Sequence, residues 1–308
     1  MRILSAFLFM VFSSYIFSAQ LQNIVIFGDS LSDNGNFYRY TQNKVPHSPT
    51  YYEGRFSNGP VWAEHLTTSY FPSPNTNHLF NYAFGGASVA VAKQAALFTL
   101  KSEIDTYLLA NNGAADPNSL IIVWIGANNY LVLPDNLSEV AVAVDQGIQQ
   151  GLQTLVTAGA KNIMVLNLPY LGNTPFAREV GMEDSLNEVT KQHNQLLENT
   201  IANLKSLNPE VQWLLFDVQT SLDDLFLNSA KYGFHNVVDS YLDTQITDSS
   251  KNSMVKVAVE TSPQNNAYCT GYLFFDAIHP TALAHVILAK NVREFLNAAE
   301  ISFANLDQ

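Results

Sequence analysis

The sequence predicts a single α/β domain in which a parallel β-sheet is covered by helices on both faces. Short apolar runs, each the length of a buried strand, alternate with segments whose apolar residues recur at helical spacing. The runs are apolar throughout rather than at every second residue, which is typical of strands buried on both faces of a sheet. The chain contains no internal repeat and no low-complexity linker that would divide it.

The elements expected in the first half of the chain each have a turn or capping signal. Residues 23–27 form a short apolar run that leads into a turn, and residues 79–84 form a second run before a glycine pair. Between them, Asn58-Gly59-Pro60 is typical of a capped helix start with proline at the first helical position. Apolar residues at helical spacing predict a further helix over residues 93–110.

The second half continues the alternation of strands and helices. The strongest strand signal of the chain is the run 119–125, which ends at Gly126. The later elements follow the same two periodicities: helices over residues 138–158, 185–205 and 282–298, and strands over residues 162–167 and 211–216. Residues 220–275 are polar, rich in Asn, Asp and Ser, and lack a clear period, so we expect irregular long loops there on the same domain.

The composition excludes several classes of protein. Of the 308 residues, 47% are hydrophobic and 14% are charged, which excludes a disordered chain, a collagen and a charge-rich coiled coil. Acidic residues outnumber Lys and Arg by 27 to 15, a net charge of −12, so no nucleic acid is expected as a partner. The single cysteine, Cys269, excludes an internal disulfide and a cysteine metal site.

Residues 1–19 have the pattern of a secretory signal peptide. Arg2 precedes an uncharged apolar run that ends at the small residue Ala19. A membrane anchor is the alternative, but the run is shorter than a span of ~20 residues and no basic cluster follows it. Phe17 stands where a small residue is usual before a cleavage site, so the position of cleavage stays open. We expect an exported protein, secreted or periplasmic, with residues 20–308 as its mature domain.

Four polar clusters lie at the ends of expected strands or beside the last helix. They are residues 28–33, 81–86, 126–129 and 276–280. Ligands bind at the carboxyl ends of the strands in such sheets, so we expect the clusters to meet. In the first, the hydroxyl of Ser30 could project from the turn, or Ser30 could be only a helix cap. In the second and third, the Gly86 N–H and the Asn128 amide could donate to a developing oxyanion, with ordinary turns as the alternative.

The fourth cluster supplies an acid and a base. Asp276 and His279, three residues apart before a helix, can place a carboxylate against one imidazole nitrogen while the other nitrogen faces a nucleophile. Zinc is the rival interpretation, but no His-Glu-x-x-His pattern or Cys/His spacing accompanies it, so we expect no metal. The Gly-x-Ser-x-Gly motif of α/β-hydrolases is absent from the sequence. The remaining histidines are interpreted as surface or core residues: His47, His65, His78, His193, His235 and His285.

Together and in this order, the four clusters resemble the sequence blocks of the GDSL, or SGNH, hydrolase family. The resemblance runs from Phe27 to Pro280, nearly the whole mature chain. The segments FGDSLSDNGN, GRFSNGPVWAEHL (54–66), NYAFGGA and DAIHPT resemble a branch of secreted bacterial phospholipases, typified by lysophospholipase A and glycerophospholipid:cholesterol acyltransferase. This branch implies a flavodoxin-like, three-layer α/β/α fold (the SGNH hydrolase fold) and serine-ester chemistry with no metal and no cofactor.

The resemblance also implies a role for each candidate residue. Ser30 is the expected catalytic nucleophile, His279 the base and Asp276 the acid that orients it. The expected oxyanion hole comprises the Ser30 N–H, the Gly86 N–H and the Asn128 side chain.

The chain departs from the family pattern at two positions. Asn129 stands where the family usually has Asp after the oxyanion Asn. Cys269 lacks the partner cysteine that many relatives carry near Tyr241, so it is expected to be free, and the loop 242–268 is expected to have no covalent link. Within the first block, Asp29 is expected only to stabilise the turn.

The expected function is hydrolysis of lysophospholipid or phospholipid esters by a secreted enzyme, with cholesterol as an alternative acyl acceptor. Transient contact with a lipid surface is expected, and the acidic chain favours zwitterionic over anionic lipid. Two alternatives stay open: a short-chain or carbohydrate acetyl-esterase on the same fold, and a non-catalytic exported binding protein. Aromatic residues near the nucleophile could form an acyl-chain wall or pack within a loop: Phe37, Tyr38, Tyr40, Tyr51 and Tyr52.

Overall fold

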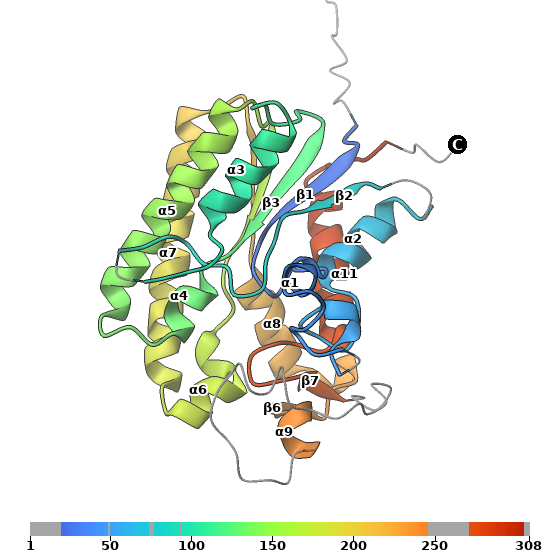
Figure 1. Ribbon diagram of the computed structural model, residues 1–308, viewed down its shortest axis with the longest axis vertical. Helices are drawn as coiled ribbons and strands as arrows, with labels where there is room; N and C mark the ends of the chain where they lie inside the picture. Colours follow the sequence, from blue (N-terminus) through green and yellow to red (C-terminus); the bar gives the residue numbers. More distant parts are fainter. Residues whose placement is uncertain (1–19, 49, 74–76, 93, 246–270, 305–308) are drawn as a thin grey trace, which may run out of the picture.

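The computed structural model describes residues 20–48, 50–73, 77–92, 94–245 and 271–304. Its centre is a five-stranded parallel sheet in the order β2-β1-β3-β4-β5 (Figure 1). The strands are β1 (Asn23–Gly28), β2 (Leu79–Asn81), β3 (Ser119–Trp124), β4 (Asn162–Leu166) and β5 (Gln212–Phe216). This is the flavodoxin-like order that was expected. Every residue of the central strand β3 is buried, which explains its continuous apolar run.

Helices cover both faces of this sheet (Figure 1). One face carries α3 (Leu100–Ala110), α5 (Leu137–Thr157) and α7 (Glu183–Leu207); the other carries α2 (Trp62–Tyr70) and α11 (Ala282–Ala298), with α8 (Val218–Leu227) packed against α11. In α5, the buried residues Val144, Ile148 and Leu152 recur at helical spacing and join the core. The predicted three-layer α/β/α fold is therefore confirmed. Within the described ranges, no helix is both long enough and apolar enough to cross a membrane.

Short elements follow the carboxyl ends of the strands. After the strands of the large sheet come α1 (Asn36–Tyr40), η1 (Tyr52–Gly54), α4 (Ala127–Leu131), η2 (Leu171–Asn173), α6 (Pro175–Val180) and η3 (Ser229–Tyr232). A second, two-stranded parallel sheet pairs β6 (Asn236–Ser240) with β7 (Tyr272–Phe274). It lies with α9 (Tyr241–Gln245) in the lower part of Figure 1.

The expectation of irregular loops over residues 220–275 is wrong for the part that the structure describes. This stretch contains most of α8, then η3, β6, α9 and β7. Leu225, Phe234 and Leu273 from this stretch form a small separate core against the start of α11. The elements are too short to show a period in the sequence, which is why no pattern indicated them.

The helix predicted over residues 93–110 begins only at Leu100. The hydroxyl of Thr99 accepts the Ser102 N–H at 3.2 Å, and the hydroxyl of Ser102 accepts the Thr99 N–H at 2.9 Å. This reciprocal capping starts the helix seven residues, about two turns, after the predicted start.

The helix predicted to begin with Pro60 begins at Trp62 instead. The carboxylate of Glu64 accepts the backbone N–H of Val61 at 3.0 Å, so Val61 rather than Asn58 occupies the capping position. The strand predicted over residues 79–84 ends at Asn81. The other predicted strands and helices lie within two residues of their expected bounds.

Some predictions concern residues outside the described ranges. The signal peptide at residues 1–19 with its cleavage site, and the free Cys269 with most of the loop 242–268, belong to this group. They stay predictions.

Candidate active site

Ser30, His279 and Asp276 form a hydrogen-bonded line at the carboxyl edge of the sheet. Ser30 lies in the turn after β1, and the other two lie between β7 and α11. The Nε2 atom of His279 lies 2.8 Å from the Oγ atom of Ser30, and its Nδ1 atom lies 2.7 Å from Oδ2 of Asp276. All three side chains are buried. The fold thus brings together two segments that are 249 positions apart.

This arrangement suits nucleophilic catalysis. With Asp276 accepting from the Nδ1–H group of His279, the Nε2 lone pair faces the Ser30 hydroxyl and can take its proton. Burial alone would raise the pKa of Asp276, but the neighbouring His279 and the backbone N–H groups of Ile278 and His279 hold it below its usual range. Asp276 therefore stays ionised and fixes the imidazole tautomer. The part of the chain that the structure describes contains no group of three or more potential metal ligands.

Every acceptor position of the Asp276 carboxylate is occupied. Oδ1 accepts the backbone N–H groups of Ile278 at 2.9 Å and His279 at 2.7 Å. Oδ2 accepts the imidazole N–H and also the hydroxyl of Tyr51, at 2.8 Å. Tyr51 therefore bonds to Asp276. It is not among the described residues that line the cavity, so the structure does not support the acyl-chain wall considered for it.

The turn that carries Ser30 is closed by its neighbour Asp29. The Oδ1 atom of Asp29 accepts the N–H of Leu31 at 3.0 Å, and its carbonyl accepts the N–H groups of Ser32 and Asp33, both at 3.0 Å. These are the turn-stabilising contacts expected of Asp29. Burial raises the pKa of Asp29 to about 6.

Asp33 links the nucleophile turn to the loop after β2. Its carboxylate accepts the backbone N–H groups of residues 35–37 and, from the other loop, the N–H of Gly85 at 2.7 Å. Asp33 is fully buried, and this burial raises its pKa. One side chain thus holds the segment after Ser30 against the segment that carries Gly86.

The three groups predicted to stabilise an oxyanion have N–H donors to spare. Among the described residues, nothing accepts the backbone N–H of Ser30 or that of Gly86. Gly86 has a φ of +74°, in the left-handed region that favours glycine. The amide of Asn128 donates to the carbonyl of Ala87 at 2.7 Å, which leaves its second N–H available. Asn128 is thus tied to the residue after Gly86, and it lines the same cavity as Ser30.

Asn129, at the position where the family usually has Asp, fixes the next part of this loop. Its Oδ1 atom accepts the Val89 N–H at 2.9 Å, and its Nδ2 atom donates to the Val89 carbonyl at 2.8 Å and to Oε1 of Gln94 at 2.7 Å. A carboxylate could make the first contact but not the other two, because it has no N–H. The departure at this position therefore matches partners that need an amide.

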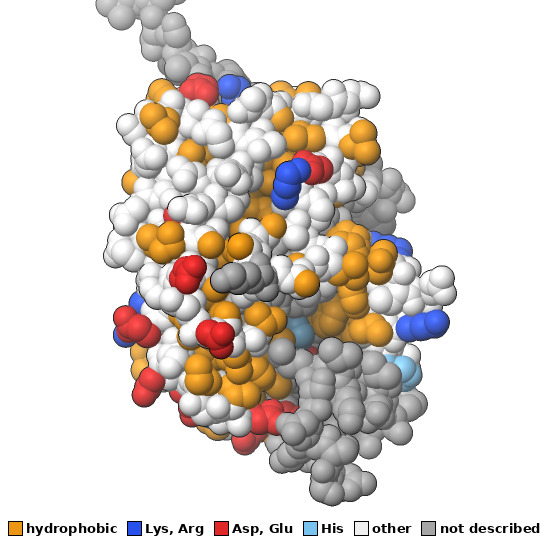
Figure 2. Space-filling view, turned by 60° about the vertical axis from the view of Figure 1, so that its left-hand side comes forward, with side chains coloured by type: hydrophobic (Ala, Val, Ile, Leu, Met, Phe, Trp, Pro, Cys, Tyr) orange, Lys and Arg blue, Asp and Glu red, His pale blue; other side chains and the backbone are white. Residues whose placement is uncertain are grey.

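Ser30, Asn128 and His279 open into a narrow cavity of about 70 Å³. Its walls are mainly apolar and include Leu131, Leu171, Leu222, Phe226, Leu273 and Phe274. Figure 2 shows hydrophobic side chains gathered in several groups on one face of the molecule. Pockets that bury a drug-sized ligand are usually ~300–1,000 Å³, so a ligand of that size would require wall side chains of this cavity to move.

The aromatic residues near the nucleophile mostly pack against one another. Among the lining residues that the structure describes, none of the five considered for an acyl wall occurs. The rings of Phe37 and Tyr40 lie 6.1 Å and 5.0 Å from that of Phe98, both edge to face. Loop packing is thus the role that the structure gives these two.

Two buried ionisable groups lie beside the site, a position that the sequence does not indicate for either of them. His285 lines the cavity, its Nδ1 atom accepts the Trp62 N–H at 3.2 Å, and burial lowers its pKa to about 3. Glu103 of α3 accepts the Gly28 N–H at 2.9 Å, and burial raises its pKa well above the usual range. Both stand on the apolar face of a predicted helix, which is the only signal that the sequence offers.

Comparisons relate the chain to known proteins. Residues 24–292 match the family model of the GDSL-like lipases and acylhydrolases. A phosphatidylcholine-sterol acyltransferase of Aeromonas hydrophila is 31% identical over 313 residues, which cover 89% of this chain and 90% of the relative. The secreted effector protein SseJ of Salmonella typhimurium is 26% identical over 278 residues; the match covers 90% of this chain and 64% of SseJ, less than two thirds of its length.

Among solved structures, a carbohydrate acetylesterase from Sinorhizobium meliloti matches with a TM-score of 0.51. The match covers 90% of this chain and 99% of the other, at 14% identity. This likeness shows the fold alone.

Proposed function

Because this chain belongs to the GDSL-like lipase/acylhydrolase family, as its sequence blocks indicate, we propose that it is a secreted serine enzyme that hydrolyses lysophospholipid or phospholipid esters. Family membership supports a hydrolase or acyltransferase; the substrate class, the catalytic residues and export are our proposal. The observation that carries it is the hydrogen-bonded line of Ser30, His279 and Asp276 beside an apolar cavity.

In the first half of the proposed reaction, Nε2 of His279 takes the hydroxyl proton of Ser30 while Oγ of Ser30 bonds to the ester carbonyl carbon. The former carbonyl oxygen then carries a negative charge, which the N–H donors of Ser30, Gly86 and Asn128 stabilise. Asp276 stabilises the imidazolium without taking its proton. The bond to the leaving alcohol breaks, that alcohol receives the proton from His279, and Ser30 carries the acyl group.

In the second half, water attacks the acyl-enzyme while His279 takes one of its protons. The second tetrahedral intermediate collapses, releases the fatty acid and returns the proton to Ser30. An alcohol in the place of water would receive the acyl group instead, which is how the same site would transfer an acyl chain to cholesterol.

The surroundings of the site support a lipid substrate. Apolar walls suit an acyl chain, and a net charge of −12 disfavours anionic lipid surfaces but permits zwitterionic head groups. The Aeromonas relative is named for phosphatidylcholine and a sterol. We therefore propose phosphatidylcholine and its lyso form as substrates, cholesterol as an alternative acceptor, and transient contact with a lipid surface as the route of access.

A short-chain or carbohydrate acetyl-esterase is the second candidate. The observation that favours it is the size of the cavity, since about 70 Å³ suits a short acyl group without movement of the walls. An exported binding protein without catalysis is disfavoured, because it would not need His279 within 2.8 Å of the Ser30 hydroxyl.

The test is release of fatty acid from lysophosphatidylcholine by the wild-type protein and by Ser30→Ala, with p-nitrophenyl acetate in a parallel assay. We expect turnover of the lysolipid that falls by about 10⁴-fold or more in the variant. Turnover of the short ester alone would contradict the lipid assignment and favour the second candidate. No turnover of either, with no labelling of Ser30 by a fluorophosphonate, would contradict both enzyme proposals.

Acyl transfer is tested in the same assay by adding cholesterol. Formation of cholesteryl ester, dependent on Ser30, is the expected result. Free fatty acid as the only product at every cholesterol concentration would contradict the transfer activity and leave hydrolysis intact.

A further inference from the structure

A loop far from the site in sequence, residues 51–58, runs alongside the segment that carries the proposed acid and base. We call it the flanking loop. Its contacts with residues 276–282 follow the same order along both segments. They are Tyr51 with Asp276 (2.8 Å), Phe56 with His279 (ring centres 5.1 Å apart), Ser57 with Pro280 (2.8 Å) and Asn58 with Ala282 (2.8 Å).

We propose that Tyr51 is a positioning residue of the triad. Its hydroxyl holds the Asp276 carboxylate in place, and it weakens the electrostatic stabilisation that this carboxylate gives to the imidazolium of His279. The inference rests on the proposed function, because it concerns how the same triad is adjusted. The Tyr51 hydroxyl bonds to Oδ2, the atom of Asp276 that also faces Nδ1 of His279 at 2.7 Å. A second donor on this oxygen draws negative charge away from the bond to the imidazole.

The position of Tyr51 depends on packing as well as on this bond. Its side chain is 1% exposed, and its ring lies edge to face against Phe275 at 5.1 Å and Phe56 at 6.2 Å. A buried hydroxyl costs free energy unless it is bonded, and Asp276 is the partner that the structure describes for it. The ring position and the bond to Asp276 therefore support each other.

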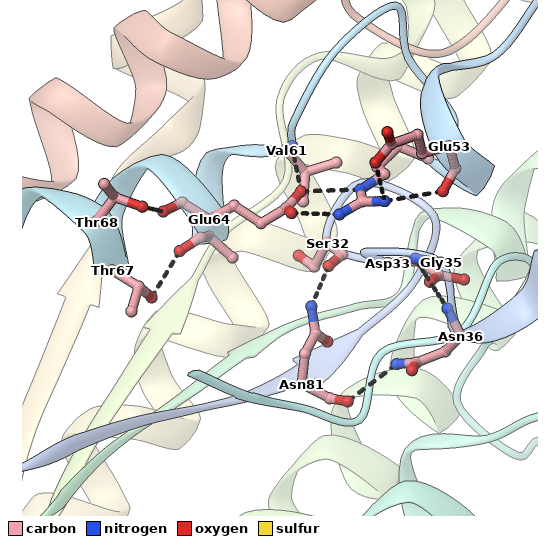
Figure 3. Close-up of polar contacts among 12 residues, drawn as sticks. Ser32, Asp33, Gly35, Asn36, Glu53, Val61, Glu64, Thr67, Thr68 and Asn81 are labelled. Carbon is pink, nitrogen blue, oxygen red and sulfur yellow. Dashed lines mark hydrogen bonds and ion pairs between the residues drawn. The ribbon is translucent and has the colours of Figure 1, made fainter. Parts of the chain in front are cut away.

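The flanking loop is itself held to helix α2 by an ion pair. The guanidinium of Arg55 donates to the two carboxylate oxygens of Glu64 at 2.5 Å and 3.2 Å, and to the carbonyl of Glu53 at 2.8 Å. Figure 3 shows the Glu64 carboxylate between this guanidinium and the backbone N–H of Val61. Because the pair is bidentate and half-buried, it restrains the flanking loop and thereby the position of Tyr51 next to Asp276.

Other ionisable groups also face this part of the site. Asp29 from the turn after β1 and His285 from α11 lie near His279, and Asp243 from α9 lies near Tyr51. In the described residues, none of them is hydrogen-bonded to the Tyr51 hydroxyl. A change in pH dependence on loss of that hydroxyl therefore reports on the bond to Asp276.

The test is the pH profile of kcat/KM for Tyr51→Phe, measured with the ester that the wild-type protein cleaves. Without the phenol donor, the Asp276 carboxylate holds the proton on the imidazolium more strongly, and the protonated form is inactive. We therefore expect the acid limb to move to higher pH by roughly half a unit. We also expect kcat to fall by about 10-fold with little change in KM, since misplacing a reacting group by 1 Å can cost ~10²-fold.

A matched control is Tyr107→Phe. Tyr107 is 2% exposed, and its hydroxyl accepts the Asp116 N–H at 2.9 Å, near the start of β3 and thus at the opposite end of the sheet. This variant also loses a buried phenol hydroxyl, but one that accepts a backbone N–H instead of donating to a carboxylate. We expect some loss of thermal stability, which controls for the loss of a buried hydroxyl in general. We expect its pH profile to match that of the wild-type protein.

A second variant keeps the inference testable if Tyr51→Phe does not fold. Incorporating 3-fluorotyrosine at position 51 retains the ring and the hydroxyl but makes the phenol a stronger donor. The acid limb should then move to lower pH, opposite to the shift in Tyr51→Phe. An acid limb that stays in place in whichever of the two variants folds would overturn the role of Tyr51.

The outcomes separate this inference from the proposed function. If the wild-type protein is active, Ser30→Ala is inactive and the Tyr51 variants keep the wild-type profile, only the role of Tyr51 is overturned. If the wild-type protein cleaves no ester and Ser30 reacts with no fluorophosphonate, the proposed function fails and this inference fails with it.

Discussion

Two buried histidines of this protein, His279 and His193, stand in opposite surroundings. His279 has a partner on each ring nitrogen, Asp276 on one side and Ser30 on the other. His193, in α7, has the Tyr130 hydroxyl 2.9 Å from Nδ1, while its buried Nε2 atom has no partner among the described residues. Burial lowers the pKa of His193 to about 4, so this side chain is neutral at neutral pH.

The difference shows what separates a candidate active site from a buried polar residue. Burial alone is enough to make a histidine neutral and to shift its pKa strongly, as at His193. Only His279 links an ionised carboxylate to a hydroxyl that faces a cavity. In this molecule a complete chain of hydrogen bonds, and not a shifted pKa, distinguishes the candidate site from the other buried histidine.

The comparison predicts opposite effects on activity for the two histidines. His279→Ala removes the proposed base, and we expect kcat to fall by about 10⁴-fold or more. His193→Gln leaves the hydrogen-bonded line untouched, so we expect its kcat at pH 8 to stay within a few-fold of the wild-type value. Both are measured on the same ester. Similar losses in the two variants would remove the distinction drawn here.

A second prediction concerns the donor that faces the cavity next to Ser30. Asn128→Ala removes one proposed oxyanion donor, and we expect kcat to fall by about 10²–10³-fold with KM much less affected. Part of any loss could come from the bond to the Ala87 carbonyl. Thermal unfolding of the same variant measures that part, and a drop in kcat that tracks unfolded protein would count against an oxyanion role.

A third prediction concerns the stability of the fold in acid. The unfolded chain protonates His193 near pH 6.5, whereas the folded protein resists protonation down to about pH 4. The free energy of unfolding should therefore fall as the pH drops through this window, by about 3 kcal/mol from His193 alone. His285, with its pKa lowered to about 3, adds a loss of the same sign.

Urea unfolding at several pH values between 7.5 and 4 measures this effect. His193→Gln should be less stable than the wild-type protein at pH 7.5, because it loses packing and the contact with Tyr130. Between pH 7.5 and 4, the free energy of unfolding of this variant should fall by less than that of the wild-type protein. The difference is the contribution of His193. Parallel pH curves for the two proteins would show that His193 does not supply this part of the acid sensitivity.

The smallest expected effect lies beside the site, at Asn129. Asn129→Asp removes two N–H donors and sets a carboxylate against the carbonyl of Val89 and Oε1 of Gln94. We expect a loss of about 2 kcal/mol in the free energy of unfolding and a few-fold fall in kcat. The loss should shrink in acid, where a protonated Asp regains one donor. An unchanged stability at pH 8 would mean that the loop repacks without these bonds.

Much of the large sheet follows from the sequence pattern alone. Residues 120–125 and 163–166 are continuous apolar runs because β3 and β4 are buried on both faces. The sequence predicts that Ser30 and Asn128 lie close together, because both follow a strand and parallel strands end at one edge of a sheet. The long helix 282–298 has the predicted bounds because its apolar spacing persists over several turns.

What the sequence could not reveal depends on contacts between distant segments. Nothing near Tyr51 in the chain indicates that its hydroxyl meets Asp276, 225 positions away. The strands β6 and β7 pair across a long stretch of sequence, and each is too short for a period to be visible. The start of α2 differs from the predicted one because Glu64, a residue inside the helix, accepts the Val61 N–H. The side chain of Asn58 instead accepts the N–H of Ala282.

Asp33 has a consequence for how the site is lost on unfolding. Its carboxylate accepts the amides of residues 35–37 and of Gly85 together. In hydrogen exchange, an opening that displaces the Asp33 side chain should expose these amides together, because all of them lose the same acceptor group. The turn of Ser30 and the loop of Gly86 then form and melt together, and molecules with half a site do not accumulate. On heating, we therefore expect activity to be lost in one sharp transition and not gradually.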